Sequence, residues 1–395
     1  MKKLISLVLA AVLAIACMGF AFAEGETAKV KLGVILLHDE DSTYDNNFIN
    51  AAKEVEAELG IELVLRRNID ESNDCYEVAC ELAEDGCNIV FADSFGHETF
   101  MIEAAKEYPE VEFCHATGTM AHTAGLDNFH NAFASIYEGR FLAGVAAGMK
   151  INEIKAAGQL KGETPLVGYV GAFTYAEVIS GYTSFFLGVR SVCPDATMKV
   201  QFTGSWYDEA EEANAAKALI AAGCDLISQH ADSMGAPSVC EAANIPNVSY
   251  NGSTVEACPN TFIVASRIDW APYLTFVCEK VAAGEKFDAD YTGTIATGSV
   301  KITDINTAAA APGTVEAVEA VKASLEDGSL KVFATDTFTV DGAALTSYLA
   351  DVDTDDAYTP DTEVIIDGVF AESYFRSAPY FDITIDGIEL LNTAF

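Results

Sequence analysis

The chain has 395 residues, of which 60 are acidic and 22 basic, so its formal net charge is −38. This charge makes nucleic acid and anionic membrane surfaces poor partners, and a solvated acidic surface is its simplest explanation. Half of the residues are hydrophobic, which excludes a disordered chain.

The chain begins like a secretory signal peptide. Met1-Lys2-Lys3 is basic, residues 4–20 are apolar, and Ala21-Phe22-Ala23 is a small-x-small cleavage site. The pattern predicts a signal peptide over residues 1–23 and an exported protein, either periplasmic or at the cell surface. No later stretch reaches the roughly eighteen apolar residues that a membrane span needs.

The same segment has a second interpretation as a lipobox over residues 13–17, in which Cys17 would carry a lipid anchor. Cleavage after Ala23 is favoured because Ala14 stands where Leu is usual. The residues that follow Cys17 are also apolar, whereas an anchored protein usually has a polar tether there.

Strands and helices alternate in the first part of the mature chain. An apolar strand over 30–37 precedes a polar loop and a helix whose Phe48, Ala52 and Val55 fall on one face. Further strands are predicted at 61–65, 88–92, 111–115 and 128–133, with helices at 73–84 and 98–108. This alternation is typical of a parallel, doubly wound α/β sheet.

A helix rich in small residues, 137–149, leads into a second alternating series. Its strands are predicted at 166–170, 197–202, 225–229, 247–250 and 262–266, and its helices at 178–189, 208–222 and 237–243. Beyond it, helices are predicted at 271–283 and 314–325, with a strand pair over 291–305 that leads between the two halves. Residues 363–395 alternate enough to predict short strands laid on the surface.

Length and pattern together predict two lobes, because the mature chain of about 370 residues exceeds what a single core usually supports. We expect lobe 1 over 29–133 plus 268–299, lobe 2 over 134–267 plus 300–340, and a C-terminal extension, 341–395, packed on the lobes. Parallel sheets bind ligands at the carboxyl ends of their strands, so two facing lobes place a site in the cleft. The loops predicted to build it are 38–45, 93–96, 116–118, 173–177, 205–208, 230–233, 251–253 and 267–270.

Nine cysteines follow Cys17, an odd number, so they cannot all be paired. Most lie in apolar or helical stretches, where a free Cys behaves as a small hydrophobic residue. Unpaired burial is the favoured interpretation, with at least one disulfide as the alternative.

The common catalytic signatures are absent. The sequence contains no G-x-G-x-x-G, G-x-x-x-x-G-K-[ST], G-x-S-x-G or H-E-x-x-H, which argues against an enzyme and predicts no cofactor or metal. An exported enzyme acting on nucleosides would need a pair of carboxylates. Asp39, Asp41 and Asp45 crowd one loop, but acids at a helix start are more typical of caps and dipole partners.

The predicted cleft loops carry aromatic and polar side chains, a combination that suits a flat, hydroxylated ligand. Core packing is the alternative role for the aromatic residues, a helix cap for Asp232 and a salt bridge for Arg267. The predicted ligand-binding residues are Asp39, Tyr44, Ser94, Phe95, Trp206, Asp232, Asn251 and Arg267.

Over residues 31–340 the sequence resembles the basic membrane protein family of ABC-transporter substrate-binding proteins, many of which bind purine nucleosides. The motifs that carry the resemblance are Asp93-Ser94-Phe95-Gly96, Tyr137-Glu138-Gly139-Arg140-Phe141-Leu142-Ala143-Gly144, Gly168-Tyr169-Val170, Glu177-Val178, Ser205-Trp206-Tyr207-Asp208 and Ser228-Gln229-His230-Ala231-Asp232-Ser233.

The resemblance implies a type I periplasmic-binding-protein fold with a three-segment hinge. It also implies that Tyr44 and Trp206 stack on a purine. Asn251 stands where many members have an Asp that holds the ribose, and Arg267 where many have a Lys. These two departures leave nucleoside and nucleobase both open as ligands.

The sequence therefore predicts the extracytoplasmic solute-binding component of an ABC importer. Its expected partners are a purine nucleoside or nucleobase and a membrane permease, and it is expected to act as a monomer. The alternative is the same fold binding a sugar or another small polar ligand, or acting as a sensory receptor.

Overall fold

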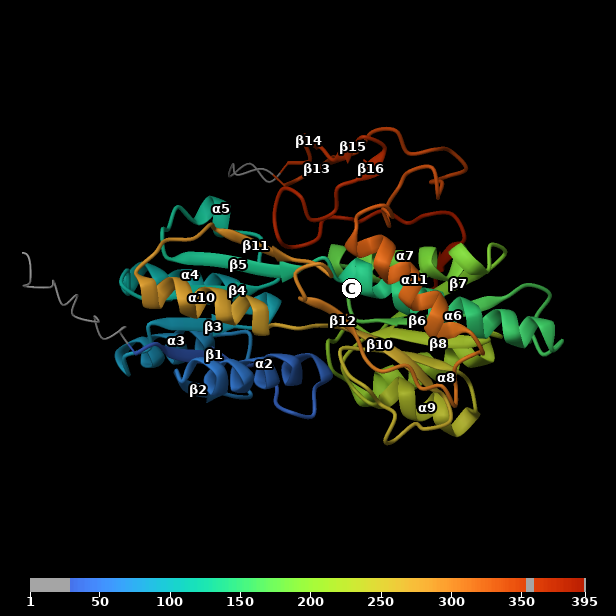
Figure 1. The fold of residues 1–395 in the computed structure, drawn as a ribbon, viewed down its shortest axis with the longest axis horizontal. Coiled ribbons are helices and arrows are strands. Elements are labelled where there is room, and N and C mark those ends of the chain that lie inside the picture. The colour runs from blue at the N-terminus through green and yellow to red at the C-terminus, as the bar shows by residue number, and fades with distance from the viewer. Residues whose placement is uncertain (1–28, 353–358, 394–395) are drawn as a thin grey trace, which may run out of the picture.

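A computed structural model describes residues 29–352 and 359–393, which form two α/β lobes side by side (Figure 1). The predicted signal peptide and Cys17 lie outside the described residues. Each lobe has one central sheet covered by helices, as the alternating pattern predicted.

Lobe 1 is built on a six-stranded parallel sheet with the order β11-β5-β4-β3-β1-β2. Its strands are β1 (Lys31–Ile35), β2 (Glu62–Arg66), β3 (Ile89–Ala92), β4 (Glu112–Ala116), β5 (Phe129–Ala134) and β11 (Asp290–Gly293). Its helices are α2 (Thr43–Leu59), α3 (Asn73–Glu84), the 3₁₀ turn η1 (Phe95–His97), α4 (Glu98–Glu107), α5 (Ala121–Ala124) and α10 (Ala271–Ala283).

Lobe 2 is built on a seven-stranded sheet with the order β12-β10-β9-β8-β6-β7-β17, in which only the β10–β12 pair is antiparallel. Its strands are β6 (Leu166–Gly171), β7 (Thr197–Phe202), β8 (Leu226–His230), β9 (Asn247–Tyr250), β10 (Phe262–Ile268), β12 (Val300–Ile302) and β17 (Ile388–Leu390). Its helices are α6 (Ile136–Ala156), α7 (Ala176–Val192), α8 (Glu209–Ala221), α9 (Gly235–Ala243) and α11 (Thr314–Glu326).

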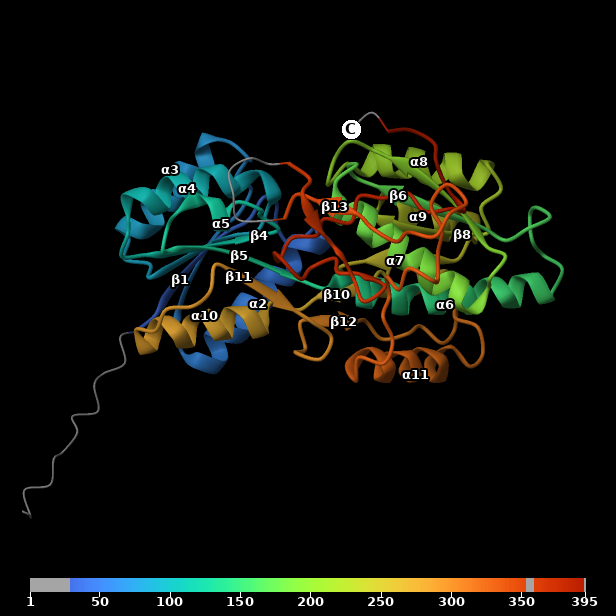
Figure 2. The ribbon, with the colours of Figure 1, turned by 90° about the horizontal axis from the view of Figure 1, so that it is seen from above.

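The chain crosses between the two sheets three times within the residues described. The crossings follow β5 into α6, β10 into α10, and β11 into β12 (Figures 1 and 2). The strand pair predicted over 291–305 is thus divided, since β11 joins the first sheet and β12 the second. Three adjacent connections form a hinge about which two rigid lobes can close.

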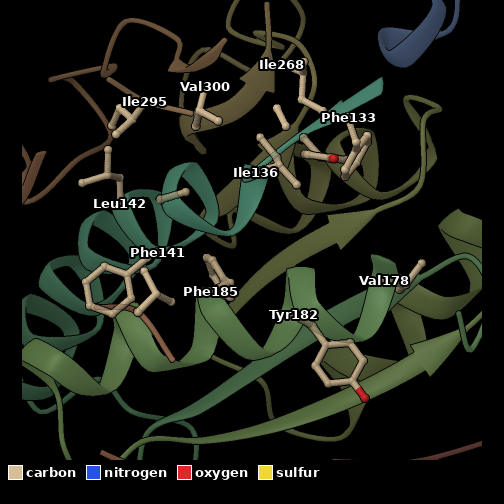
Figure 3. Packing of buried hydrophobic residues seen from close by; sticks show 14 of the residues in the cluster. Phe133, Ile136, Phe141, Leu142, Val178, Tyr182, Phe185, Ile268, Ile295 and Val300 are labelled. Carbon is tan, nitrogen blue, oxygen red and sulfur yellow. The ribbon is translucent and has the colours of Figure 1, made fainter. Parts of the chain in front are cut away.

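The small residues of α6 allow it to pack closely against α7 in the core of lobe 2. A methyl group added at Gly144 would lie 2.0 Å from the carbonyl oxygen of Phe185, and one at Gly188 would lie 2.1 Å from that of Phe141. Even alanine therefore cannot fit at either glycine. Figure 3 shows the apolar side chains around this helix pair, which belong to the largest buried cluster of the molecule.

The C-terminal segment, residues 341–393 as far as the structure describes them, differs from one expectation. Residues 363–395 were expected to be laid on the surface, but Val364, Phe370 and Phe381 are at most 1% exposed and belong to the main core. Two small hairpins occur in it, β13 (Leu349–Ala350) with β14 (Thr362–Glu363), and β15 (Ile365–Ile366) with β16 (Val369–Phe370). Strand β17 then pairs with β7, so the segment completes the sheet of lobe 2.

All nine cysteines of the described residues are unpaired, and only Cys80 among them is not fully buried. Burial raises the pKa of every one of these thiols. The favoured interpretation, in which the cysteines pack as small hydrophobic residues, is therefore confirmed for the described chain.

Candidate functional site

A cavity lies between the two lobes. All of its lining residues except Leu37 and Tyr250 come from loops that the sequence predicted to build the cleft. The lining residues are Leu37, His38, Tyr44, Asp45, Ser94, Phe95 and Thr117 from lobe 1, and Glu177, Trp206, His230, Asp232 and Tyr250 from lobe 2.

The lobes touch each other around this cavity. The backbone N–H of Thr43 donates to the carbonyl oxygen of Asp232 at 3.3 Å, and the side-chain amide of Asn47 donates to the carbonyl oxygen of Asn251 at 3.0 Å. The rings of Phe95 and Tyr175, which face each other from opposite lobes, have centroids 5.3 Å apart. The molecule is therefore in a closed arrangement.

One aromatic side chain from each lobe is held rigidly at the cavity. The hydroxyl of Tyr44 donates to the carbonyl oxygen of Asp93 at 2.8 Å, and its ring packs edge-on against Phe48. The ring of Trp206 lies edge-on to Phe173, with centroids 5.0 Å apart. Both rings have their edges fixed by neighbours, an arrangement that suits stacking on a flat ligand.

Lobe 1 contributes two neighbouring acids, Asp45, which lines the cavity, and the buried Asp93, which does not. Asp45 accepts hydrogen bonds from the backbone N–H of His38 at 2.7 Å and from the hydroxyl of Ser42 at 2.5 Å. Burial and the neighbouring Asp45 charge raise the pKa of Asp93 well above its ordinary value. Burial would also raise the pKa of Asp45, but its hydrogen bonds lower it. The pair therefore favours the proton on Asp93 and the negative charge on Asp45.

Lobe 2 contributes two acids and a histidine. Burial raises the pKa of Glu177 to about 7 and that of Asp232 well above its ordinary value. Burial, assisted by the nearby Arg140 charge, lowers the pKa of His230 well below its ordinary value, so this ring is neutral. His230 Nε2 lies 3.5 Å from Glu177 Oε1. A carboxyl group whose pKa is raised can both donate and accept hydrogen bonds when it carries its proton, and so can a neutral imidazole.

A buried arginine supports this wall of the cavity from behind. The Arg140 guanidinium is fully buried, lies 3.8 Å from the centroid of the Tyr250 ring, and donates to the carbonyl oxygen of Gln229 at 2.7 Å. Its charge opposes the effect of burial on the pKa of Glu177. Arg140 thus positions Tyr250 and limits the rise in the pKa of Glu177 without lining the cavity.

Five predicted site residues line the cavity, namely Tyr44, Ser94, Phe95, Trp206 and Asp232.

The other three predicted residues lie elsewhere. Asn251 is one step behind the wall, where its side-chain amide donates to Asp232 Oδ1 at 3.2 Å. Asp39 accepts a hydrogen bond from Asn68 at 3.4 Å and does not line the cavity. Arg267 lines a separate groove, with its guanidinium 3.7 Å from Asp269.

Sequence reasoning missed several lining residues. Glu177 and His230 belong to motifs that carry the family resemblance and lie in predicted cleft loops, but neither is among the predicted site residues. Tyr250 is the last residue of β9, a position that could have indicated it, because strand ends face the cleft.

Comparison with protein families decides what kind of protein this site belongs to. The model of the Bmp family, described as PnrA-like ABC transporter substrate-binding proteins, matches residues 33–317. The chain belongs to this family. It is accordingly an extracytoplasmic solute-binding protein and not an enzyme, and it serves a transporter with a permease in the membrane.

Individual relatives agree with this membership. A purine-binding protein of Brucella abortus is 35% identical over 260 residues, which cover 65% of this chain and 69% of the relative. An ABC transporter nucleoside-binding protein of Lactococcus lactis is 26% identical over 229 residues, covering 56% of this chain and 61% of the relative.

Solved structures confirm the type I periplasmic-binding fold. A solute-binding protein of an ABC transporter from Conexibacter woesei has a TM-score of 0.63 at 20% identity, covering 76% of this chain and 98% of the other. One from Aeropyrum pernix has a TM-score of 0.64 at 16% identity, covering 76% and 92%. Within the described residues, every helix is too short or too polar to cross a membrane.

Proposed function

We propose that this Bmp-family protein binds a purine nucleoside or nucleobase between its lobes. The observation that carries the proposal is one cavity lined by Tyr44 and Trp206 from opposite lobes together with the buried acids Glu177 and Asp232. Stacking of a base on an aromatic ring contributes ~1 to 3 kcal/mol. The acids and His230 supply donors and acceptors for base edges or sugar hydroxyls.

The charge of the cavity lining narrows the ligand further. The lining residues include no Lys or Arg among the residues described, and they include three carboxyl groups, those of Asp45, Glu177 and Asp232. A phosphate group would find no cation there and would be repelled by the ionised carboxylate of Asp45, so a nucleoside or base fits better than a nucleotide.

The relatives lend support without deciding the ligand. The Brucella abortus relative is named as a purine-binding protein, and the one from Lactococcus lactis as nucleoside-binding. We further propose that the chain acts as a monomer and that nucleic acid is not a partner, in keeping with its net charge of −38.

A sugar is the second candidate. An ABC transporter protein of Haloferax volcanii, whose name proposes glucose as its ligand, is 28% identical over 288 residues and covers 68% of this chain and 70% of its own length. A sugar would stack one face on Trp206 and bond its hydroxyls to Asp232, but it would leave the ring of Tyr44 without a flat partner.

A thermal shift screen of the mature protein, unfolded and refolded first to remove bound solutes, tests the proposal. A ligand present at 100 times its Kd should add ~2.7 kcal/mol to the free energy of unfolding. Inosine, guanosine, adenosine, their bases, ribose and glucose form the panel. Stabilisation by a nucleoside or base is expected, whereas a response to glucose alone would overturn the proposal in favour of a sugar.

A further inference from the structure

The C-terminal segment is anchored in lobe 2. Strand β17 extends the lobe 2 sheet beside β7, and the rings of Phe333 and Phe381 stack with centroids 4.5 Å apart. The carboxylate of Glu372, which is 2% exposed, accepts a hydrogen bond from the hydroxyl of Ser180 on α7 at 2.5 Å. Any movement of lobe 2 therefore carries this segment with it.

The same segment reaches across to lobe 1. The backbone N–H of Ser377 donates to Asp290 Oδ1 of β11 at 2.7 Å. The other oxygen of Asp290 lies 2.6 Å from Nε2 of His122 on α5. Ser377 is 0% exposed, and the side chains of Asp290 and His122 are 14% and 19% exposed. The contact is shielded from water, which strengthens a hydrogen bond to a charged acceptor.

This crossing lies beside the ligand cavity. A groove adjoins the cavity and shares three lining residues with it, Phe95, Thr117 and Glu177. Its opposite wall is made by Arg376, Ala378, Pro379 and Asp382 of the C-terminal segment. Figures 1 and 2 show the segment running over the junction of the two lobes.

The turn that makes the crossing is tied down within its own segment. The guanidinium of Arg376 donates to the carbonyl oxygen of Asp351 at 3.0 Å and to that of Ala378 at 3.3 Å. These bonds hold the turn in shape. Because the segment is anchored in lobe 2, the turn cannot simply follow lobe 1 when the lobes separate. Rotation about the hinge must then lengthen the distance from Ser377 to Asp290.

We propose that residues 372–382 form a clasp between the lobes, with Asp290 as its receptor, and that this clasp slows ligand release. The closed arrangement is stabilised by the hydrogen bond from Ser377, which has to break before the cleft can open fully. The inference rests on the closed two-lobe structure and does not depend on which ligand the cavity takes. Asp290 acts as a positioning residue, because it touches the clasp and not the cavity.

The test compares Asp290→Ala with Glu389→Ala, which removes an acid that pairs with Lys199 inside lobe 2. With inosine as the probe in stopped-flow measurements, Asp290→Ala should speed dissociation about tenfold and should not slow association. Glu389→Ala should leave both rates unchanged. An unchanged dissociation rate in Asp290→Ala would overturn the clasp, and slowed association would indicate a folding defect instead.

A second variant, Ser377→Pro, removes the donor from the other side of the same hydrogen bond. If one contact is responsible, each single change and the double change should speed dissociation equally, whereas additive effects would contradict the clasp. Circular dichroism verifies that each variant is folded.

Small-angle scattering of the ligand-free protein separates this inference from the proposed function. Asp290→Ala should give a larger radius of gyration than the unmodified chain whether or not inosine binds. Equal radii would count against the clasp even if inosine proves to be the ligand.

Discussion

The two lobes line the cavity in different ways. In lobe 1, Tyr44 and Asp45 have their hydrogen bonds satisfied by their own lobe. In lobe 2, the carboxylate of Glu177 has a long hydrogen-bond contact of 3.5 Å with His230, and the buried hydroxyl of Tyr250 has no hydrogen-bond partner among the described residues. An unmet buried polar group costs about 1 to 3 kcal/mol. The hydrogen-bonding groups of Tyr44 and Asp45 in lobe 1 are thus already satisfied. Those of Glu177 and Tyr250 in lobe 2 are free to bind a ligand when the lobes close.

The largest effect that we expect is on the pH dependence of the free energy of unfolding, through a buried acid that packs against lobe 2. Burial raises the pKa of Glu372, which packs against lobe 2, to about 7. A raised pKa means that the folded state holds the proton more tightly, so the free energy of unfolding falls as pH rises from about 4.5 to about 7. Glu372→Gln should remove this fall and be more stable at pH 8 by up to about 3 kcal/mol, measured by urea unfolding.

Glu112 in lobe 1 provides a control, because its effect on stability should change with pH in the opposite direction. Burial would raise the pKa of Glu112, but its hydrogen bond with His130 and the charges nearby lower it. Its stabilising contribution is therefore present above its unfolded pKa and is lost as pH falls. Glu112→Gln should reduce stability at pH 7 and change nothing in strong acid. If both variants respond to pH in the same direction, the contrast between the lobes is wrong.

The next effect concerns the acid that we expect to bind sugar hydroxyls. Asp232→Ala should weaken inosine binding about 100-fold, because hydrogen bonds to charged or buried acids contribute about 1.5 to 3 kcal/mol. Titration calorimetry with inosine and hypoxanthine measures both Kd values, and the base should lose less affinity than the nucleoside. Glu209→Ala removes an exposed acid of the same lobe and should have no effect.

Removing the stacking ring of Trp206 should weaken binding less than Asp232→Ala does. It should weaken the base and the nucleoside alike. Trp206→Ala is expected to weaken inosine and hypoxanthine by a similar factor, on the order of tenfold, while Trp206→Phe should retain most of the affinity. The same calorimetric titrations measure the Kd values of both variants for inosine and hypoxanthine. Unchanged binding in Trp206→Ala would mean that the ring packs against Phe173 without touching the ligand.

The smallest effect is expected for Arg267, which lines a separate groove and lies 3.7 Å from Asp269. Arg267→Ala should change the Kd for inosine less than about twofold, because Arg267 does not line the ligand cavity. A large loss in the same titration would show that this groove joins the ligand site when the lobes move.

The fold could be read from the sequence because its signals are local. Alternating apolar strands and amphipathic helices predicted both parallel sheets, and helix α3 has the predicted bounds. The C-terminal segment was harder, because its strands β13 to β16 are two residues long and contacts distant in sequence hold them. Periodicity cannot be recognised over so few residues.

Only part of the site could be predicted, because local sequence patterns locate the loops but do not determine which of their side chains line the cavity. Strand order places the loops at the cleft, but which side of a loop faces the cavity depends on contacts distant in sequence. Asp39 and Arg267 fall on the other side of their segments, whereas Glu177 and His230 face inward. Asn251 lies behind the wall, so its departure from the family pattern acts through Asp232.

The unpaired cysteines have a consequence for how the two lobes are held together. Exported proteins commonly depend on disulfides formed in an oxidising compartment, yet none joins the nine cysteines of the described residues. Burial keeps their thiols protonated and therefore poor nucleophiles toward oxidants. The two lobes, as far as the structure describes them, are thus held together by packing and hydrogen bonds without covalent cross-links.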